Sequence, residues 1–237
     1  MLKKLSFLLH FIMLNAAVLQ PILTTQPWES CPSGNQKVVP ASECHPPENL
    51  GIAHRRVVAY YENGCFEKEL AEVVKQAKKK FNKPATSTWQ AFIFDIDDTV
   101  LSDYCNVKSI QFGFVPEFAH DWITRAEVPA IPLMKNFYNY LIKKGYHIIF
   151  LTGRPHNQYE ATEKNLQNQG FTAYDKLILR SGDHKGLSTQ AYKALERSKL
   201  VKEGYEIVGT AGDQWSDLTG DHIGTPIKVP NYMYFIE

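Results

Sequence analysis

The fold of this chain is decided by one short stretch, Ala91-Phe92-Ile93-Phe94-Asp95-Ile96-Asp97-Asp98-Thr99. Its first four residues form an uninterrupted apolar run, which is typical of a strand buried on both faces of a parallel sheet. The run ends abruptly in acidic residues. Because ligand sites of open α/β sheets lie at the carboxyl ends of the strands, the stretch predicts a first strand that delivers carboxylates to a functional site.

The same pattern recurs along the rest of the chain. Apolar runs of strand length predict four further strands, at 147–151, 176–179, 206–209 and 226–229. Stretches with helical periodicity lie among them, at 132–144, 157–169 and 188–203. Strands that alternate with helices of this length predict an α/β fold with a Rossmann-like, doubly wound parallel sheet.

N-terminal helices and an insert complete the predicted fold. Two helices are expected ahead of the sheet, at 54–61, closed by Asn63-Gly64, and at 66–81, where apolar residues recur at helical spacing. The insert at about 101–129 is too long for a plain strand-to-helix loop. Its aromatic residues favour a small cap that walls the substrate site or, equally, a satellite core: Tyr104, Phe112, Phe114, Phe118 and Trp122.

The beginning of the chain differs in character from the rest. Lys3 and Lys4 precede an apolar stretch from Leu5 to Leu19, which is the pattern of a secretory signal peptide, placed at 1–20. The alternative is an uncleaved amphipathic anchor. The proline-rich residues 21–48 predict an irregular arm, and 49–237 a single main domain. We therefore expect an exported protein, periplasmic or secreted.

The overall composition limits the partners of the protein. The formal net charge of the 237 residues is +1, and no long block of like charges appears, so a nucleic-acid partner or a stable membrane partner is not indicated. The oligomeric state stays open. The four cysteines match no zinc site; in an oxidising compartment three disulfide pairings are possible among Cys31, Cys44, Cys65 and Cys105.

Acidic and polar residues gather at the predicted carboxyl ends of the strands. They are Asp95, Asp97 and Asp98 after the first strand, Thr152, Gly153 and Arg154 after the second, and Asp213 and Asp217 after the fourth. Converging carboxylates repel one another unless a cation joins them. Oxygen ligands favour Mg²⁺ or Ca²⁺, and Val100 stands where an EF-hand loop needs glycine. We therefore expect Mg²⁺ shared with a phosphate.

These residue types suit phosphoryl transfer, which needs an in-line nucleophile, an acid for the leaving oxygen and cations on the phosphoryl group. Asp95 can attack phosphorus and form an aspartyl-phosphate. Asp97 points to the same side of an extended chain and can protonate the leaving group. Thr152-Gly153 offers a hydroxyl and backbone N–H groups at the expected start of a helix, with Pro155 in its first turn.

Four motifs in this order resemble those of the haloacid dehalogenase (HAD) superfamily: Phe94-Asp95-Ile96-Asp97-Asp98-Thr99, Leu151-Thr152-Gly153-Arg154, a later lysine, and Gly212-Asp213-Gln214-Trp215-Ser216-Asp217. From about His54 onward the chain is similar to the subfamily IIIB acid phosphatases, which include plant vegetative storage proteins and secreted bacterial acid phosphatases. Trp122 ahead of Pro129-Ala130-Ile131-Pro132, and Tyr192-Lys193, belong to this likeness. The resemblance implies a HAD-like, Mg²⁺-dependent phosphatase for phosphate monoesters.

The resemblance also implies a role for each residue. Asp95 would be the nucleophile, and Asp97 the general acid and base, whose backbone carbonyl also binds the metal. Asp213 would be the direct Mg²⁺ ligand, with Asp217 in support. Thr152, Gly153, Arg154 and Lys193 would hold the phosphoryl group, and Lys193 would also neutralise the nucleophile.

Several alternatives stay open at this point. Lys185 is the rival to Lys193, since loops can place either lysine near the site. Arg154 could pair with a site carboxylate in place of touching the substrate. Asp98 and Thr99 could cap the following turn. At the level of the whole protein, the rivals are a storage or binding protein of the vegetative storage type, and a phosphotransferase that uses the same intermediate.

Overall fold

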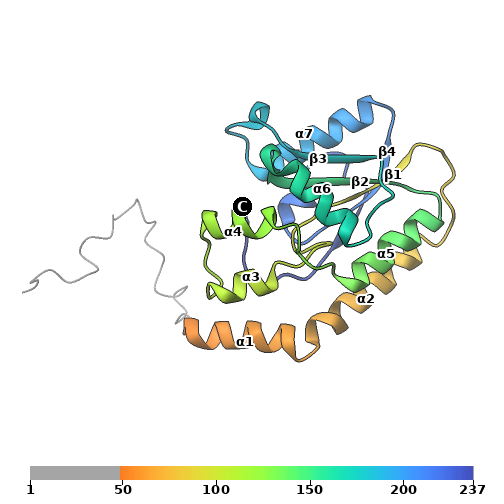
Figure 1. Ribbon diagram of the computed structural model, residues 1–237. Helices are drawn as coiled ribbons and strands as arrows, with labels where there is room; N and C mark the ends of the chain where they lie inside the picture. The colour runs from red at the N-terminus through yellow and green to blue at the C-terminus, as the bar shows by residue number, and fades with distance from the viewer. Residues whose placement is uncertain (1–48, 237) are drawn as a thin grey trace, which may run out of the picture. The chain divides into compact units, whose positions relative to one another are not determined.

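The computed structural model describes residues 49–236, which form an α/β domain (Figure 1). Its helices are α1 (Leu50–Glu62), α2 (Cys65–Lys80), α3 (Tyr104–Ser109), α4 (Pro116–Thr124), α5 (Pro132–Lys143), α6 (Tyr159–Asn168) and α7 (Thr189–Lys202). Its strands are β1 (Gln90–Phe94), β2 (His147–Pro155), β3 (Lys176–Arg180), β4 (Glu206–Gly212) and β5 (Thr225–Lys228). Short 3-10 turns are η3 (His156–Gln158), η4 (Gly182–His184) and η5 (Trp215–Asp217).

The five strands form one parallel sheet in the order β3-β2-β1-β4-β5. The predicted α/β fold with a Rossmann-like parallel sheet and N-terminal helices is therefore confirmed. β1 lies in the middle of the sheet, between β2 and β4. The carboxyl ends of these three strands consequently lie next to one another at the point where the strand order reverses, which is where open α/β sheets bind ligands.

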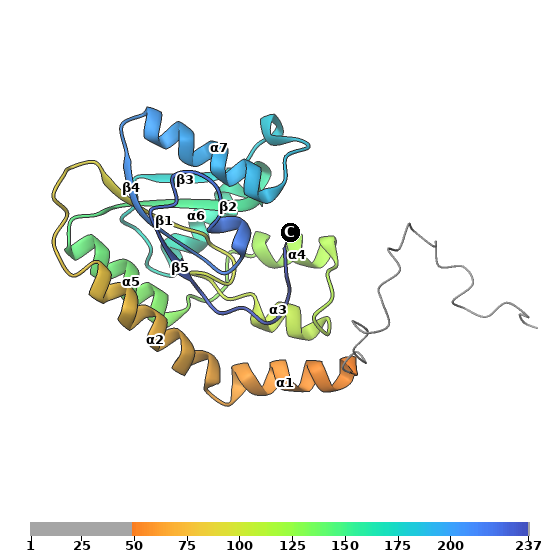
Figure 2. The same cartoon turned by 180° about the vertical axis from the view of Figure 1, so that it is seen from behind.

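Each face of the sheet is buried by its own set of helices. Phe92 and Phe94 of β1 belong to the larger core cluster, with residues of α2 and α5, whereas Ala91 and Ile93 join Tyr192 of α7 on the other face. The two views of the fold show α7 on one side of the sheet and α2 and α5 on the other (Figures 1 and 2). The sequence of β1 is a continuous apolar run because both of its faces pack in the hydrophobic core.

Of the two N-terminal helices, α1 is longer than predicted and α2 has the predicted length. Helix α1 begins at Leu50, four residues before the predicted start, because Asn49 caps it by accepting a hydrogen bond from the N–H of Gly51. It ends at Asn63-Gly64 as expected, and Gly64 has a φ of 78°, a conformation that glycine adopts without strain.

The insert between β1 and α5 contains two short helices, α3 and α4, that the sequence did not predict. Three of its aromatic residues, Tyr104, Phe112 and Trp122, pack against the main core, in keeping with the satellite-core interpretation. The other two, Phe114 and Phe118, are exposed. The satellite-core interpretation therefore applies to the first three side chains, and a wall of the substrate site formed by the other two stays a prediction.

One local prediction was wrong. The segment Thr152–Pro155 is not the start of a helix, because β2 continues to Pro155, the turn η3 follows, and α6 begins only at Tyr159. Pro155 pairs with Arg180 of β3 after a register shift, which extends the strand beyond its apolar part. Any anion held by Thr152 and Gly153 would accordingly lie at the end of a strand and not at a helix N-terminus.

Several predictions concern residues 1–48, which lie outside the described part of the chain: the signal peptide (1–20), the arm (21–48) and any disulfide of Cys31 or Cys44. Within residues 49–236, Cys65 and Cys105 are both free and exposed. Among the helices of this same part, none is long and apolar enough to cross a membrane.

Candidate active site

The candidate active site is centred on Asp95, the first residue after β1. Its backbone N–H donates to the carbonyl of Ala211 at 2.9 Å, which continues the β1–β4 pairing by one residue and fixes the direction of the side chain. Asp95 is only 6% exposed. A carboxylate that is so deeply buried at the end of a central strand requires charged partners.

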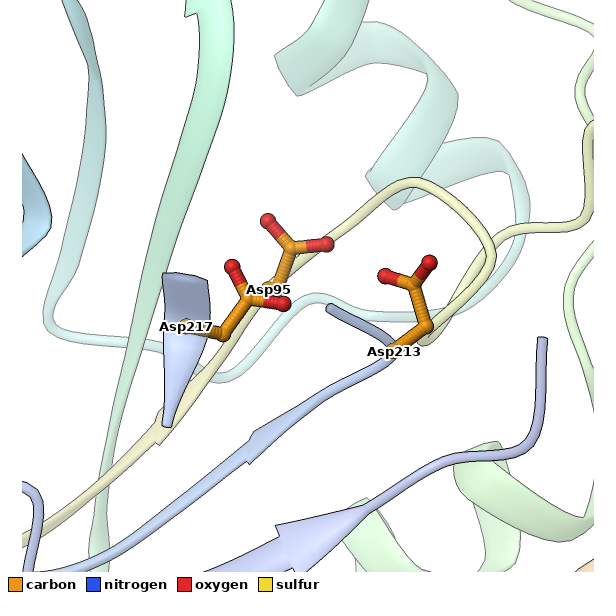
Figure 3. Close-up of side chains that lie close together, drawn as sticks. All are labelled: Asp95, Asp213 and Asp217. Atoms are coloured by element: carbon orange, nitrogen blue, oxygen red, sulfur yellow. The ribbon is translucent and has the colours of Figure 1, made fainter. Parts of the chain in front are cut away.

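Two further buried aspartates stand beside Asp95. One carboxylate oxygen each of Asp95, Asp213 and Asp217 lies within 4.8 Å of the others, a group that could hold a metal ion (Figure 3). Asp213 directly follows β4, and Asp217 ends η5. Gly212 makes this possible, because a Cβ there would lie 2.3 Å from the side chain of Asp217. In the pattern Gly-Asp-x-x-x-Asp, the first position must therefore be glycine so that the second aspartate has room.

A lysine from α7 reaches this group of acids. The ammonium of Lys193 donates to Oδ1 of Asp95 at 2.5 Å and to Oδ1 of Asp217, and Lys193 is buried. Burial lowers the pKa of this lysine, but the charges of Asp217 and Asp95 outweigh it and raise the pKa above its ordinary value. The rival lysine, Lys185, is exposed at the end of η4. The structure thus brings Lys193, and not Lys185, to Asp95.

Asp97 is held by a different cation, Arg154. The guanidinium donates from Nε at 3.0 and 3.1 Å to the two oxygens of Asp97 and from Nη2 at 2.6 Å to Oδ1, while Nη1 donates to Thr162 at 3.2 Å. Burial acts to raise the pKa of Asp97, but the charge and hydrogen bonds of Arg154 lower it below the ordinary aspartate value. Arg154 is therefore paired with a site carboxylate, one of the two roles that the sequence left open.

Thr152 and Gly153 lie in the last part of β2, ahead of η3 and α6. Thr152 is buried, its hydroxyl accepts the N–H of Arg154 at 3.1 Å, and its carbonyl accepts the hydroxyl of Tyr192 at 3.0 Å. Gly153 is exposed, and a Cβ there would meet nothing within 4 Å. Two hydrogen bonds thus hold Thr152 in place, while Gly153 is exposed and a side chain there would meet open space.

The electrostatics of the acids fit a divalent cation. Burial, together with Asp217 and other neighbouring carboxylates, raises the pKa of Asp95 well above the ordinary value and that of Asp213 to about 6. Lys193 brings a single positive charge to this group of three carboxylates, two of which accept its hydrogen bonds. Since the donors are all oxygens and the negative charge is in excess, the residues present suit a hard divalent cation, the class to which Mg²⁺ and Ca²⁺ belong.

Sequence reasoning gave Asp98 and Thr99 only a possible capping role, and it missed Tyr234. Thr99 donates to Asp213 at 3.2 Å and does not cap a helix. Asp98 has a φ of 51°, accepts the N–H of Asp103 at 2.9 Å, and accepts the hydroxyl of Tyr234 at 2.7 Å. No local pattern marks Tyr234, because its partner lies 136 positions away.

Asp103, in the insert, was missed as well. Its carboxylate accepts the indole N–H of Trp122 at 2.8 Å, and burial beside Asp97 and Asp98 raises its pKa well above the ordinary value. The cap is therefore connected to the site through an acid. The only hint of this in the sequence is the presence of an aspartate shortly after the first motif.

Residues 42–237 match the family model of the HAD superfamily, subfamily IIIB (Acid phosphatase). The chain belongs to this family. Among curated proteins, the stem 31 kDa glycoprotein of Glycine max is 41% identical over 62% of this chain and 59% of its own length. Acid phosphatase 1 of Solanum lycopersicum is 37% identical over 61% of this chain and 58% of its own length. Vegetative storage protein 1 of Arabidopsis thaliana is 35% identical over 63% and 56%, respectively.

These matches span about three-fifths of the relatives' own lengths. Two solved structures of the class C acid phosphatase from Bacillus anthracis, one with tungstate bound, are similar in fold. They align with TM-scores of 0.64 and 0.61 at 25% and 26% identity, each over 78% of this chain and 85% of theirs. The membership in the HAD acid phosphatases that the motifs implied is therefore confirmed.

Proposed function

We propose that this protein is a Mg²⁺-dependent acid phosphatase that hydrolyses phosphate monoesters through an aspartyl-phosphate on Asp95. The observation that supports this most directly is the buried carboxylate of Asp95, held at Oδ1 by Lys193 beside Asp213 and Asp217. Among the described residues, none donates a hydrogen bond to Oδ2 of Asp95, so this oxygen has a free lone pair for attack. Buried acid groups with this charge environment are typical of catalytic sites.

In the first step, Asp95 attacks phosphorus in line with the ester oxygen. A bond forms between the carboxylate oxygen and phosphorus, and the bond between phosphorus and the ester oxygen breaks. Asp97 donates a proton to the leaving oxygen, which departs as an alcohol. Thr152 and the backbone of Gly153 hold the phosphoryl oxygens, and Lys193 offsets the negative charge that Asp95 brings to the phosphate.

In the second step, Asp97 acts in reverse. Its carboxylate takes a proton from a water molecule that attacks phosphorus on the side vacated by the alcohol. The bond between phosphorus and Asp95 breaks, inorganic phosphate leaves, and both aspartates return to their starting state. Arg154 keeps Asp97 in one position through both proton transfers, because three hydrogen bonds fix the two groups to each other.

Asp95, Asp213 and the backbone carbonyl of Asp97 would hold Mg²⁺, with Asp217 in support. Bound there, the ion neutralises charge on the phosphoryl oxygens and on the nucleophile. Asp217 is already bonded to Lys193 and, at 2.9 Å, to the N–H of Gln214, which suits a supporting position. The relative from Bacillus anthracis whose structure contains tungstate supports an oxyanion site in this fold.

The substrate class we propose is a small-molecule phosphate monoester, and the site of action lies outside the cytosol. The first inference rests on the family. The second rests on the basic and apolar start of the sequence, Lys3 to Leu19. The likeness to vegetative storage proteins raises the alternative of a storage role. The intact set of nucleophile, acid and lysine argues against the loss of catalysis that such a role would permit.

The test is hydrolysis of p-nitrophenyl phosphate from acid to neutral pH, with Mg²⁺ or with EDTA. Asp95→Asn should reduce kcat by several orders of magnitude, because it removes the attacking group. Asp183→Asn is the matched control, since Asp183 is exposed in η4 and its side chain makes no hydrogen bond or ion pair with a site residue in the described part of the chain. Full activity of Asp95→Asn would contradict the covalent mechanism. A folded, Mg²⁺-supplied wild type that turns over no monoester would instead favour the storage role.

A further inference from the structure

The segment that follows β5, residues 229–236, returns across the candidate site. It begins where the N–H of Val229 donates to the carbonyl of Gly212 at 2.9 Å, and Met233 anchors it in the main core. Further along, Tyr234 donates to Asp98, and the N–H of Ile236 donates to Oε1 of Gln214 at 2.9 Å. The segment therefore contacts residues next to both acidic motifs.

Asn231 is the residue of this segment that touches a proposed metal ligand. Its amide Nδ2 donates to Oδ2 of Asp213 at 2.7 Å, and its Oδ1 accepts the N–H of Met233 at 2.8 Å. The second contact closes a local turn. One side chain thus ties the fold of its own segment to the orientation of a carboxylate 18 positions earlier.

The hydrogen bonds on Asp213 are unequally divided between its two oxygens. Oδ2 accepts two amide donors, Nε2 of Gln214 at 2.6 Å and Nδ2 of Asn231 at 2.7 Å. Among residues 49–236, Oδ1 accepts only the hydroxyl of Thr99, at the longer distance of 3.2 Å. Because two donors occupy the lone pairs of Oδ2, Oδ1 is the oxygen with capacity left for a cation.

We propose that Asn231 is a positioning residue for the cation: by holding Oδ2 of Asp213, it turns Oδ1 toward the metal site. The inference rests on the proposed Mg²⁺ site. Outer partners that orient a metal-binding carboxylate typically change metal affinity by about 10- to 100-fold when they are removed. Asn231 is half-buried, so its loss also admits water to compete for Oδ2.

The segment offers a matched control. Tyr232, the next residue, contacts α1 and α2 and not Asp213. Its hydroxyl donates to Glu69 of α2 at 3.3 Å, and its ring centroid lies 4.8 Å from that of Tyr60 in α1. Tyr232→Phe removes one hydrogen bond of the same segment without touching Asp213. Any effect of loosening the segment as a whole should therefore appear in this variant too.

The experiment is a calorimetric titration of the metal-free full chain with Mg²⁺, for wild type, Asn231→Ser, Asn231→Ala and Tyr232→Phe. Serine keeps an acceptor for the N–H of Met233 but is too short to reach Asp213. Both Asn231 variants should bind Mg²⁺ about 10-fold more weakly or worse, and Tyr232→Phe should bind it like the wild type. Thermal melts of the metal-free proteins show whether each variant is folded.

Each other outcome overturns the inference in a distinguishable way. If Asn231→Ser binds Mg²⁺ as tightly as the wild type and only Asn231→Ala is weakened, Asn231 acts through its turn alone. If Tyr232→Phe is weakened as much as the Asn231 variants, the segment acts only as a structural anchor. If the wild type itself binds no Mg²⁺, the proposed cofactor fails together with this inference.

Discussion

Asp95 and Asp97 are two residues apart but experience opposite electrostatic environments. Burial and neighbouring carboxylates raise the pKa of Asp95, whereas Arg154 holds the pKa of Asp97 below its ordinary value in spite of burial. A general acid with a low pKa is protonated only at acid pH. The pairing of Asp97 with Arg154 therefore links the proposed mechanism to acid phosphatase activity.

Substitution of Arg154 tests this link. Arg154→Lys keeps the positive charge but loses the bidentate hydrogen bonding to Asp97, so the pKa of Asp97 should rise. Because Asp97 must be protonated to serve the leaving group, the alkaline limb of the kcat profile should move to higher pH. We expect kcat to fall about 10- to 100-fold with an alkyl phosphate at the optimum, while KM changes little. The measurement is kcat and KM as a function of pH.

Arg55→Lys, on the exposed face of α1, is the control for this substitution. A large rise in KM with an unshifted pH profile would show that Arg154 contacts the substrate directly, which is the other role that the sequence left open.

At the scale of elements, α7 carries two cations one turn apart on its buried face. Lys193 reaches Asp95, and the guanidinium of Arg197 donates to the carbonyls of Asp217, Thr219 and Asp221 at 3.0, 2.5 and 2.8 Å. These carbonyls belong to the last residue of η5 and to the loop that follows it. The helix thus supplies both a charge for the nucleophile and the hydrogen bonds that hold the loop with Asp217.

Arg197→Met should destabilise the fold through this loop. The variant leaves three carbonyls without their donor, and the loss of donors to buried carbonyls costs about 1–3 kcal/mol each when water cannot replace them. We expect the free energy of unfolding to fall by about 3 kcal/mol in urea denaturation. Lys202→Met, exposed on the last turn of α7, should cost less than about 1 kcal/mol. Equal losses in the two variants would contradict the role of Arg197.

At the scale of the whole molecule, the acid cluster makes stability depend on pH and on metal. Burial raises the folded-state pKa of Asp213 to about 6 and of Asp98 to about 8. The pKa values of Asp95 and Asp103 are raised too, and that of Asp97 is lowered. A carboxyl with a raised folded pKa contributes stability that is complete below the unfolded pKa and is lost as pH rises through the folded pKa.

The metal-free protein should therefore have a Tm that falls as the pH rises from about 4 to about 8. Mg²⁺ at about 100 times its Kd should add about 2.7 kcal/mol at the upper end of this range. It should add less near pH 5, because protons compete for the same oxygens. Melting curves with Mg²⁺ and with EDTA across this range test the prediction. A Tm of the metal-free protein that rises toward neutral pH would contradict it.

Much of the fold was predictable because its signals are local. The apolar run Ala91–Phe94 has core on both faces and is recognisable without any partner. The end of β2 was not predictable, since Thr152–Pro155 is extended only through its pairing with Arg180 of β3. Helices α3 and α4 were missed because they are short and have no fully buried residue, so they lack a strong apolar stripe.

The sequence by itself determined the type of sheet, the strand ends that carry Asp95, Asp97, Asp213 and Asp217, and the expectation of a cation, because strand periodicity and the repulsion of like charges are properties of short segments. Only the tertiary structure decided which group satisfies each acid: Lys193 for Asp95, Arg154 for Asp97, and Asn231 for Asp213. The physical reason is that these contacts join residues 18 to 98 positions apart. Their geometry depends on how the helices and the last segment pack on the sheet, and no spacing along the chain records it.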